Sequence, residues 1–360
     1  MEMLSSSLRA ESSTATLEDF GRDYPMEVEE MRPVAAYFPF KLNPYYASLM
    51  DSPGDPIWLQ CIPDPRELQD LGGMEDPLAE EVLSPVPNLV HRYPNRVLWL
   101  VSHQCAVHCR FCTRKRRWRE PVPLTDANME AALEYIGKTP DIQDVLLSGG
   151  DPLLLPMKRL EALLSSLRKI PHVEIIRIGS RVPCVDPRRI TQEWAAMLAR
   201  YHPVYLNLHF NHPREITDDS RAACAILANA GIPLGSQTVL LRGVNDAPEI
   251  LGALFQKLLT MRVRPYYLLQ MDLTRGTSHF RTPVGTGLKI VHALRNRISG
   301  LAMPHYVIDL PGGRGKIPVT PRYVQEVNGN FMVLKDSWGR RCEYPLLEGE
   351  GDDLRAWMSG

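Results

Sequence analysis

Long apolar runs and an excess of charge of either sign are both missing from this sequence. Its 360 residues carry 41 Lys and Arg against 42 Asp and Glu, so the net charge of −1 gives no indication of a nucleic acid partner. No apolar stretch approaches the length needed to cross a bilayer, and the N-terminus, rich in Ser and Glu, lacks a basic start followed by an apolar run. We therefore expect a cytoplasmic protein that binds neither nucleic acid nor membrane.

Cysteine is scarce as well. Seven cysteines in a chain of this length argue against a disulfide framework and indicate reduced thiols. Four of them are scattered: Cys61, Cys184, Cys224 and Cys342. The other three, Cys105, Cys109 and Cys112, follow the apolar run 97–101 at CxxxCxxC spacing.

Three thiolates so close together favour an iron-sulfur cluster over zinc, because structural zinc takes four protein ligands and a fourth is not nearby. Three cysteines leave one iron of a 4Fe-4S cube open, and that iron can bind a ligand that is also a substrate. The alternatives are three unrelated thiols, or half of a zinc ribbon, although no second CxxC occurs in the chain.

Short apolar runs alternate with stretches of helical periodicity from Arg96 onward, which is the pattern of repeated βα units. The expected strands are 97–101, 144–147, 173–178, 204–209, 234–240 and 264–271. The expected helices are 128–138, 160–169, 189–201, 219–230, 248–262 and 284–298. These units predict an α/β fold, an incomplete (βα)6 barrel of the TIM type, with an open sheet as the alternative. In both forms ligands gather at the carboxyl ends of the strands.

The chain divides into four expected parts. Residues 1–92, rich in Pro and acidic side chains, predict an irregular, partly helical cap, and residues 93–300 the partial barrel. Residues 301–345 predict a separate C-terminal β segment that has its own strand at 305–308 and carries a candidate cofactor lysine. Residues 346–360 are polar and predict a loose tail.

Polar residues follow the expected strands. The turn 148–151, of sequence Ser-Gly-Gly-Asp, comes directly after the second strand, where backbone N–H groups can approach a bound carboxylate or amine. Gln237 lies in the fifth strand, and Asp272 closes the sixth. A Gly-Gly turn is usually only a turn, but this one lies one strand away from the cysteine loop, which favours a binding role.

Lys316 ends a glycine-rich segment that could be mistaken for a phosphate loop. Leu310 occupies the first Gly position of GxxxxGK, and Ile317 stands where Ser or Thr is needed. What remains is a lysine suited to a Schiff base with pyridoxal phosphate, or an ordinary surface lysine. Arg92 and Arg96 could bind the phosphate of that cofactor, with surface salt bridges as the alternative.

A basic run occupies residues 114–119. By default such a run forms a solvated face. With Trp118 as a stacking platform it could instead belong to an Fe-S or zinc module that binds RNA, although the near-neutral net charge and the lack of further basic stripes speak against this class.

Eight segments together resemble lysine 2,3-aminomutase and its relatives, which are radical S-adenosylmethionine enzymes that also use pyridoxal phosphate. They are residues 92–96, 105–114, 146–151, 178–183, 207–213, 235–246, 264–283 and 309–318. The resemblance implies an isomerase that converts L-lysine to β-lysine by 1,2-amino migration. The implied cofactors are a 4Fe-4S cluster, S-adenosyl-L-methionine and pyridoxal 5′-phosphate.

The resemblance also implies the residues that hold these cofactors. The cluster ligands would be Cys105, Cys109 and Cys112. The residues at the methionine part of S-adenosylmethionine would be Ser148, Gly149, Gly150 and Asp151. Lys316 would form the Schiff base, with Arg92 and Arg96 at the cofactor phosphate and Gln237 in the same pocket.

For the substrate, the resemblance implies that Arg114 pairs with the α-carboxylate and that Asp272 and Asp309 receive the distal ammonium. Two carboxylates around one ammonium are reasonable, since a charge taken out of water must be paired. A glutamate tail would be repelled by them. Ornithine, arginine and glutamate are the alternative substrates.

The implied partners are a small amino-acid substrate, a low-potential electron donor such as flavodoxin or ferredoxin, and further copies of the chain in a homo-oligomer. Zinc-binding relatives carry a Cys directly after a Val-Asn-Asp segment and a Cys-rich C-terminal extension. Here Ala247 takes the first position, and only Cys342 lies near the end, so we expect no structural zinc.

Overall fold

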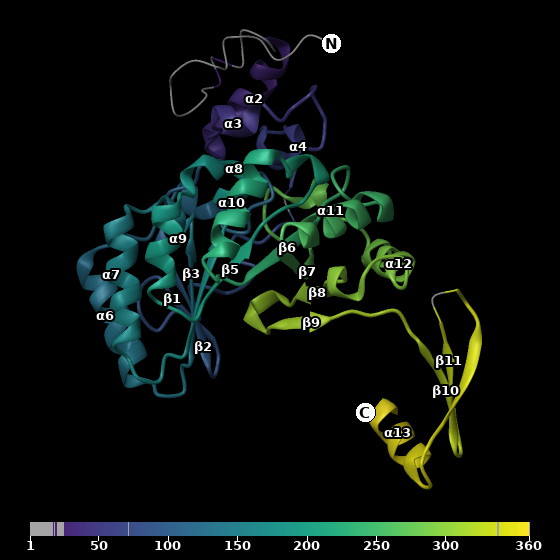
Figure 1. The fold of residues 1–360 in the computed structure, drawn as a ribbon. Helices are drawn as coiled ribbons and strands as arrows, with labels where there is room; N and C mark the ends of the chain where they lie inside the picture. Colours follow the sequence, from purple (N-terminus) through teal and green to yellow (C-terminus); the bar gives the residue numbers. More distant parts are fainter. Residues whose placement is uncertain (1–16, 18, 20–24, 71, 337, 360) are drawn as a thin grey trace.

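The computed structural model describes residues 17, 19, 25–70, 72–336 and 338–359 (Figure 1). Nine strands form one curved sheet in the order of the chain. They are β1 Leu89–Tyr93, β2 Arg96–Ser102, β3 Asp144–Gly149, β4 Ile175–Ser180, β5 Val204–Leu208, β6 Leu234–Leu240, β7 Val263–Gln270, β8 His305–Asp309 and β9 Lys316–Pro318. Strands β2 to β8 run parallel, and β1 and β9 pair antiparallel at the two edges.

Helices alternate with these strands and cover the outside of the sheet (Figure 1). They are α6 Asp126–Lys138, α7 Met157–Arg168, α9 Gln192–Ala199, α10 Asp218–Asn229, α11 Pro248–Thr260 and α12 Val284–Leu294. The side chains of Thr125, Thr191 and Thr217 cap the N-termini of α6, α9 and α10, because each hydroxyl accepts a hydrogen bond from a free backbone N–H of the first turn. The predicted partial barrel is confirmed.

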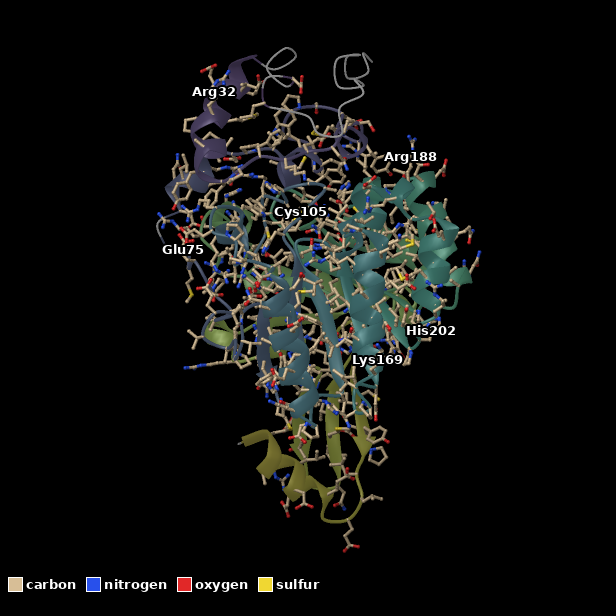
Figure 2. All side chains as sticks on the ribbon, turned by 90° about the vertical axis from the view of Figure 1, so that its left-hand side faces the viewer. Arg32, Glu75, Cys105, Lys169, Arg188 and His202 are labelled. Atoms are coloured by element: carbon tan, nitrogen blue, oxygen red, sulfur yellow. The ribbon has the colours of Figure 1, made fainter. Side chains whose placement is uncertain are left out.

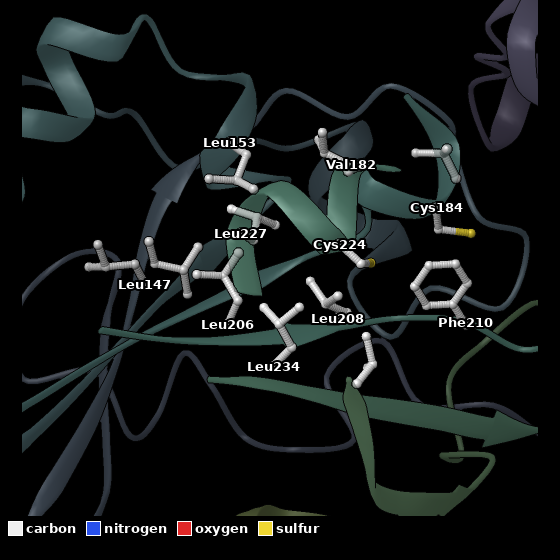
Figure 3. Close-up of a cluster of buried hydrophobic side chains, with 14 of the residues drawn as sticks. Leu147, Leu153, Val182, Cys184, Leu206, Leu208, Phe210, Cys224, Leu227 and Leu234 are labelled. Atoms are coloured by element: carbon white, nitrogen blue, oxygen red, sulfur yellow. The ribbon is translucent and has the colours of Figure 1, made fainter. Parts of the chain in front are cut away.

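The core between sheet and helices is aliphatic. Figure 3 shows Leu206 and Leu208 of β5 and Leu234 of β6 beside Leu227 of α10, and these side chains are all buried. Burying one such side chain contributes roughly 1.5–3 kcal/mol, so this layer holds the barrel wall rigid behind the site.

The sheet is longer at both edges than the sequence predicted. The sequence predicts a strand at 305–308 in a separate segment, whereas in the structure β8 pairs in parallel with β7, with Tyr267 opposite His305. At the other edge β1 begins at Leu89, inside the expected cap, and pairs with β2. Short edge strands give little sequence signal, because their pairing is decided by the neighbouring strand.

A second sheet of three antiparallel strands follows the barrel. It consists of β10 Val324–Asn328, β11 Phe331–Lys335 and β12 Arg341–Pro345. Figure 1 shows this sheet and helix α13, Glu350–Ser359, apart from the main body. Residues 350–359 of the expected tail are thus helical. Acidic residues in the first turn of α13 interact favourably with the helix dipole, and the Glu350 side chain accepts the Leu347 N–H at 2.8 Å.

Short helices of the N-terminal segment lie over one end of the barrel (Figure 1). They are α2 Pro25–Tyr37, α3 Pro44–Ala47, α4 Trp58–Cys61 and α5 Arg66–Gln69. In Figure 2, Cys105 lies between this segment and the barrel strands. Over the described residues, no helix is at once long and apolar enough to cross a membrane.

Candidate active site

A cavity of about 550 Å³ occupies the concave side of the barrel and the carboxyl ends of its strands. Every residue that the sequence predicted for the site lines this cavity. They are Arg92, Arg96, Cys105, Cys109, Cys112, Arg114, Ser148, Gly149, Gly150, Asp151, Gln237, Asp272, Asp309 and Lys316. The structure therefore brings these residues together, while the role of each remains a prediction.

The three thiols lie on the loop that leaves β2, and none is in a disulfide. Two of them accept hydrogen bonds: Arg181 Nη1 donates to Cys109 Sγ at 2.7 Å, and the Arg114 backbone N–H donates to Cys112 Sγ at 3.4 Å. Among the described residues no three potential ligands converge as they would around a single metal ion. A cube with one iron for each thiolate spreads its ligands more widely than a single ion does, so this donor set fits a 4Fe-4S cluster.

The cysteine loop packs so closely against the Gly149-Gly150 turn that both positions require glycine. The Gly150 N–H donates to the Ser102 carbonyl at 2.6 Å, and the Asp151 N–H donates to the Gln104 carbonyl at 2.6 Å. A Cβ on Gly150 would lie 2.3 Å from the Gln104 carbonyl oxygen, and a Cβ on Gly149 would lie 2.3 Å from that of Ser102. Only glycine permits this approach, and Gly149 also has a φ of +120°.

Asp151 fixes the chain that follows β4. Its carboxylate accepts from the Ser180 hydroxyl at 2.8 Å, from the Arg181 N–H at 2.7 Å and from the Val182 N–H at 3.1 Å. Burial raises the pKa of Asp151 above its ordinary value in spite of these donors. Most of its accepting capacity is thus used within the protein.

Arg181, which Asp151 holds by its backbone, is a buried residue within the segment 178–183, and no motif in the sequence assigns it a role of its own. Its Nη2 donates to Glu215 Oε1 at 2.7 Å, to the Tyr46 hydroxyl at 2.8 Å and to Gln60 Oε1 at 2.8 Å. Glu215, Tyr46 and Gln60 come from parts of the chain that gave no site signal. This network anchors the guanidinium group that bonds to Cys109.

Lys316 and Arg92 meet on one carboxylate. Asp309 forms an ion pair with the Lys316 amine through one oxygen and with Arg92 Nη1, at 2.8 Å, through the other. The Lys316 backbone N–H donates to the Tyr93 hydroxyl at 3.2 Å, and the Arg96 guanidinium lies 3.8 Å from the Tyr93 ring centroid. The two edge strands of the barrel, β1 and β9, therefore meet across its open side through side chains.

This corner has the donor set for pyridoxal phosphate. An amine can bond to the aldehyde, and two guanidinium groups can hold the phosphate. The side-chain nitrogen of Asn207, which also lines the cavity, is buried and has no hydrogen-bond partner among the described residues. Such an orphan donor fits a polar ligand in the cavity, as S-adenosylmethionine would be.

Asp272 lies near Asp309 in the same cavity and titrates abnormally. Burial, followed by repulsion from Asp309, raises the pKa of Asp272 to about 7, although Lys316 and Arg92 oppose the shift. Two carboxylates that repel one another in a buried site favour a bound cation, because the cation would relieve their repulsion.

The basic run 114–119 is not a solvated face, so that prediction was wrong. Lys115 is buried and lies 2.6 Å from Glu67, and Arg116 lies 2.9 Å from Glu81. The Trp118 ring is stacked on His108 with centroids 4.4 Å apart. Acidic residues of the N-terminal segment supply the partners, because buried cations must be paired. Most of these charges are therefore paired within the protein, and His108 covers one face of the Trp118 ring, which does not favour RNA binding.

Comparison with known proteins agrees with this geometry. Residues 99–252 match the Radical SAM superfamily, and residues 291–351 match the family Lysine-2,3-aminomutase. The chain is 49% identical over 331 residues to L-lysine 2,3-aminomutase of Acetoanaerobium sticklandii, across 90% of this chain and 80% of that protein. Identity to L-lysine 2,3-aminomutase of Clostridium subterminale is 48% over 333 residues, with the same coverage. Identity to glutamate 2,3-aminomutase of Clostridioides difficile is 42% over 317 residues, across 87% and 75%.

The partial barrel and its thiol loop, together with the superfamily match, define a radical S-adenosylmethionine enzyme. That class carries a 4Fe-4S cluster and S-adenosyl-L-methionine. Within it, the chain belongs to the lysine 2,3-aminomutase family of isomerases, whose members are pyridoxal phosphate-dependent.

Proposed function

We propose that this protein is an L-lysine 2,3-aminomutase, which moves the α-amine of L-lysine to the β-carbon and yields β-lysine. The observation that carries the proposal is the distribution of charge in the cavity. Asp272 and Asp309 lie at one side, beside Lys316, and Arg114 presents a guanidinium group to the same space. An α-carboxylate and a distal ammonium on one small substrate match these two groups.

Each residue then has a separate task. Arg114 binds the α-carboxylate, and the aspartate pair binds the distal ammonium, so the substrate chain is held at both ends and its α- and β-carbons are fixed between them. Lys316 supplies the amine that carries pyridoxal phosphate, and Arg92 and Arg96 hold its phosphate. Cys105, Cys109 and Cys112 hold the cluster. When bound, the cofactors supply hydrogen transfer and electron delocalisation, and the protein supplies orientation and exclusion of water.

The distal ammonium has to displace an existing ion pair. The Lys316 ammonium pairs with one oxygen of Asp309. If the Lys316 amine held pyridoxal phosphate, that oxygen could pair with the ammonium of the substrate. Asp272 completes the pairing, since a second carboxylate compensates for the loss of water around a buried cation.

A panel of substrates tests this proposal. The enzyme, reconstituted and assayed without oxygen, is offered L-lysine, ornithine, arginine and glutamate. We expect the highest kcat/KM for L-lysine, weaker turnover of the other basic amino acids because their tails differ in length, and least turnover of glutamate. Faster turnover of glutamate than of L-lysine would overturn the assignment of the aspartate pair.

Three finer points stay predictions. A low-potential flavodoxin or ferredoxin is expected to reduce the cluster, the chain is expected to form a homo-oligomer, and its location is expected to be the cytoplasm. The electron donor and the homo-oligomer rest on the family resemblance. The location rests on the lack of long apolar runs in the sequence.

A further inference from the structure

Glu80 belongs to the N-terminal segment, outside the barrel, yet it lines the cavity and is only 1% exposed. It holds Arg114 by three contacts. Arg114 Nε donates to Oε1 at 2.9 Å and to Oε2 at 3.0 Å, and Nη2 donates to Oε1 at 2.6 Å. A carboxylate that binds two nitrogens of a guanidinium group fixes the plane of that group.

The rest of the Arg114 guanidinium remains available. Among the residues that the structure describes, Nη1 makes no hydrogen bond, and it is not among the buried nitrogens that lack a partner. The Arg114 side chain keeps 19% of its surface exposed and lines the cavity. Its free donor therefore faces the space where a ligand would bind.

We propose that Glu80 is a positioning residue for the substrate: it holds Arg114 so that the free edge of the guanidinium meets the α-carboxylate. This inference deepens the proposed function and rests on it, because Arg114 is assigned to the α-carboxylate there. Glu80 does not touch the substrate and acts through Arg114.

Glu80 has guanidinium neighbours besides Arg114. Arg116 Nη2 lies 3.4 Å from Glu80 Oε2, and Arg117 is also near enough to stabilise the carboxylate. One buried carboxylate thus faces three guanidinium groups. Asp76 and Glu81 are further acidic partners of Arg116, at 3.0 Å and 2.9 Å, so what an incoming carboxylate can use is the free Nη1 donor of Arg114.

The backbone beside Glu80 is strained in a way that serves this contact. Ala79 has a φ of +52°, in the left-handed region that residues with a Cβ seldom adopt. The turn is held by the Ala79 N–H to the Asp76 carbonyl at 3.2 Å and by the Leu83 N–H to the Ala79 carbonyl at 3.0 Å. Such conformations persist where the surrounding structure imposes them, and they gather at functional sites.

The same turn reaches the other end of the site. The Leu78 carbonyl accepts from Arg92 Nη2 at 3.3 Å, and the Pro77 carbonyl accepts from the Gly312 N–H at 2.8 Å, on the loop that leads to Lys316. Residues 77–80 therefore set the distance between the carboxylate-binding arginine and the corner that carries Lys316.

The test compares two ligands in holoenzyme variants. The ligands are L-lysine and 1,5-diaminopentane, which is lysine without its carboxylate, and binding is followed by the change in pyridoxal absorbance. The variants are Glu80→Gln and Glu80→Asp. Glu80→Gln keeps the shape of the side chain but loses its charge, and Glu80→Asp keeps the charge but places it one methylene farther from Arg114. Glu81→Gln is the matched control, because Glu81 is 57% exposed and pairs with Arg116 alone.

We expect Glu80→Gln and Glu80→Asp to raise the Kd of L-lysine by about tenfold or more, because the hydrogen-bonded arginine loses its fixed orientation. The Kd of the diamine should stay unchanged, and Glu81→Gln should alter neither. Equal weakening of both ligands would show a general structural role and overturn the proposal, as would no change for L-lysine in either Glu80 variant.

Failure of the proposed function has a different signature. If the wild-type enzyme bound glutamate and not L-lysine, the tail assignment would be wrong, but glutamate also carries an α-carboxylate. The same comparison of Glu80 variants is then made with glutamate, and a loss of glutamate affinity would still support the role of Glu80.

Discussion

Asp272 is a residue of the cavity whose environment lowers the stability of the folded protein near neutral pH. Its carboxylate is buried beside Asp309, and burial together with this repulsion raises the pKa of Asp272 to about 7. A raised carboxyl pKa means that the folded state loses stability as the pH rises from the ordinary value near 4 through 7. The charged form of Asp272 therefore destabilises the fold near neutral pH, and we attribute the presence of this residue to the proposed binding of the substrate ammonium.

The raised pKa of Asp272 predicts how kcat/KM depends on pH. Below pH 7 Asp272 is protonated and is a weak partner for the substrate ammonium, so kcat/KM for L-lysine should rise with pH and level off above about 7. In Asp309→Asn the neighbouring negative charge is absent, and the inflection should move to lower pH. Steady-state rates across this pH range check both points, and an inflection that does not move in Asp309→Asn would contradict the assignment.

At the scale of elements, the site depends on how closely β3 and the cysteine loop approach one another. The turn after β3 has no room for a Cβ against the backbone of residues 102–104, and its N–H groups bond to that backbone. The Ser-Gly-Gly-Asp motif predicts a binding role for these glycines. The structure adds a packing reason, which holds whether or not a ligand is bound.

Gly150→Ala tests this packing. A Cβ 2.3 Å from the Gln104 carbonyl oxygen must push the loop away, because the obstacle is backbone and not a flexible side chain. We expect the variant to bind less iron on reconstitution and to show weaker visible absorbance than the wild type. Gly137→Ala in α6 is the control, because no atom lies within 4 Å of its added Cβ and alanine favours a helix. Normal iron content in Gly150→Ala would refute this account.

At the scale of the whole molecule, the N-terminal segment is part of the site. Glu67 of α5 pairs with Arg110 and Lys115, both 2.6 Å away. Arg110 lies between Cys109 and Cys112, and Lys115 lies just after the last cysteine. Asp70 accepts the N–H groups of residues 276–278, in the loop that leaves β7 beyond Asp272. Charged contacts thus tie the cap to the barrel at two places.

Glu67→Gln should destabilise the cofactor-free protein by about 3 kcal/mol near neutral pH, because two buried cations lose their carboxylate. Burial raises the pKa of Glu67, but Arg110 and Lys115 outweigh it and hold the pKa below its ordinary value. The stabilisation is therefore present above about pH 4.5 and is lost as the pH falls through the lower, folded-state pKa.

Urea unfolding measures this difference. Glu134→Gln is the control, because Glu134 is an exposed partner of Lys138 on α6 and its loss should leave the midpoint unchanged. If the urea midpoint of Glu67→Gln equalled that of the wild type, the contact between cap and barrel would contribute no net stability.

Much of the barrel and the site was predictable because the signals are local. The strand 97–101 is a short apolar run between polar residues, and the cysteine spacing lies within a single loop. Residues at the carboxyl ends of parallel strands must share one edge, so the convergence of Asp272 and the thiols follows from topology once the strands are known.

The partners of buried charges were not predictable in this way. Arg114 and Glu80 are 34 residues apart, and Asp70 and Gly276 are 206 apart, with no pattern that links them. The sequence alone determined the kind of fold and the family, and it predicted which residues hold the cofactors. Only the tertiary structure decided that the basic run is buried, that β8 joins the sheet and that Glu80 orients Arg114. Those outcomes depend on which distant segments the chain brings together, and short-range pattern carries no information about that choice.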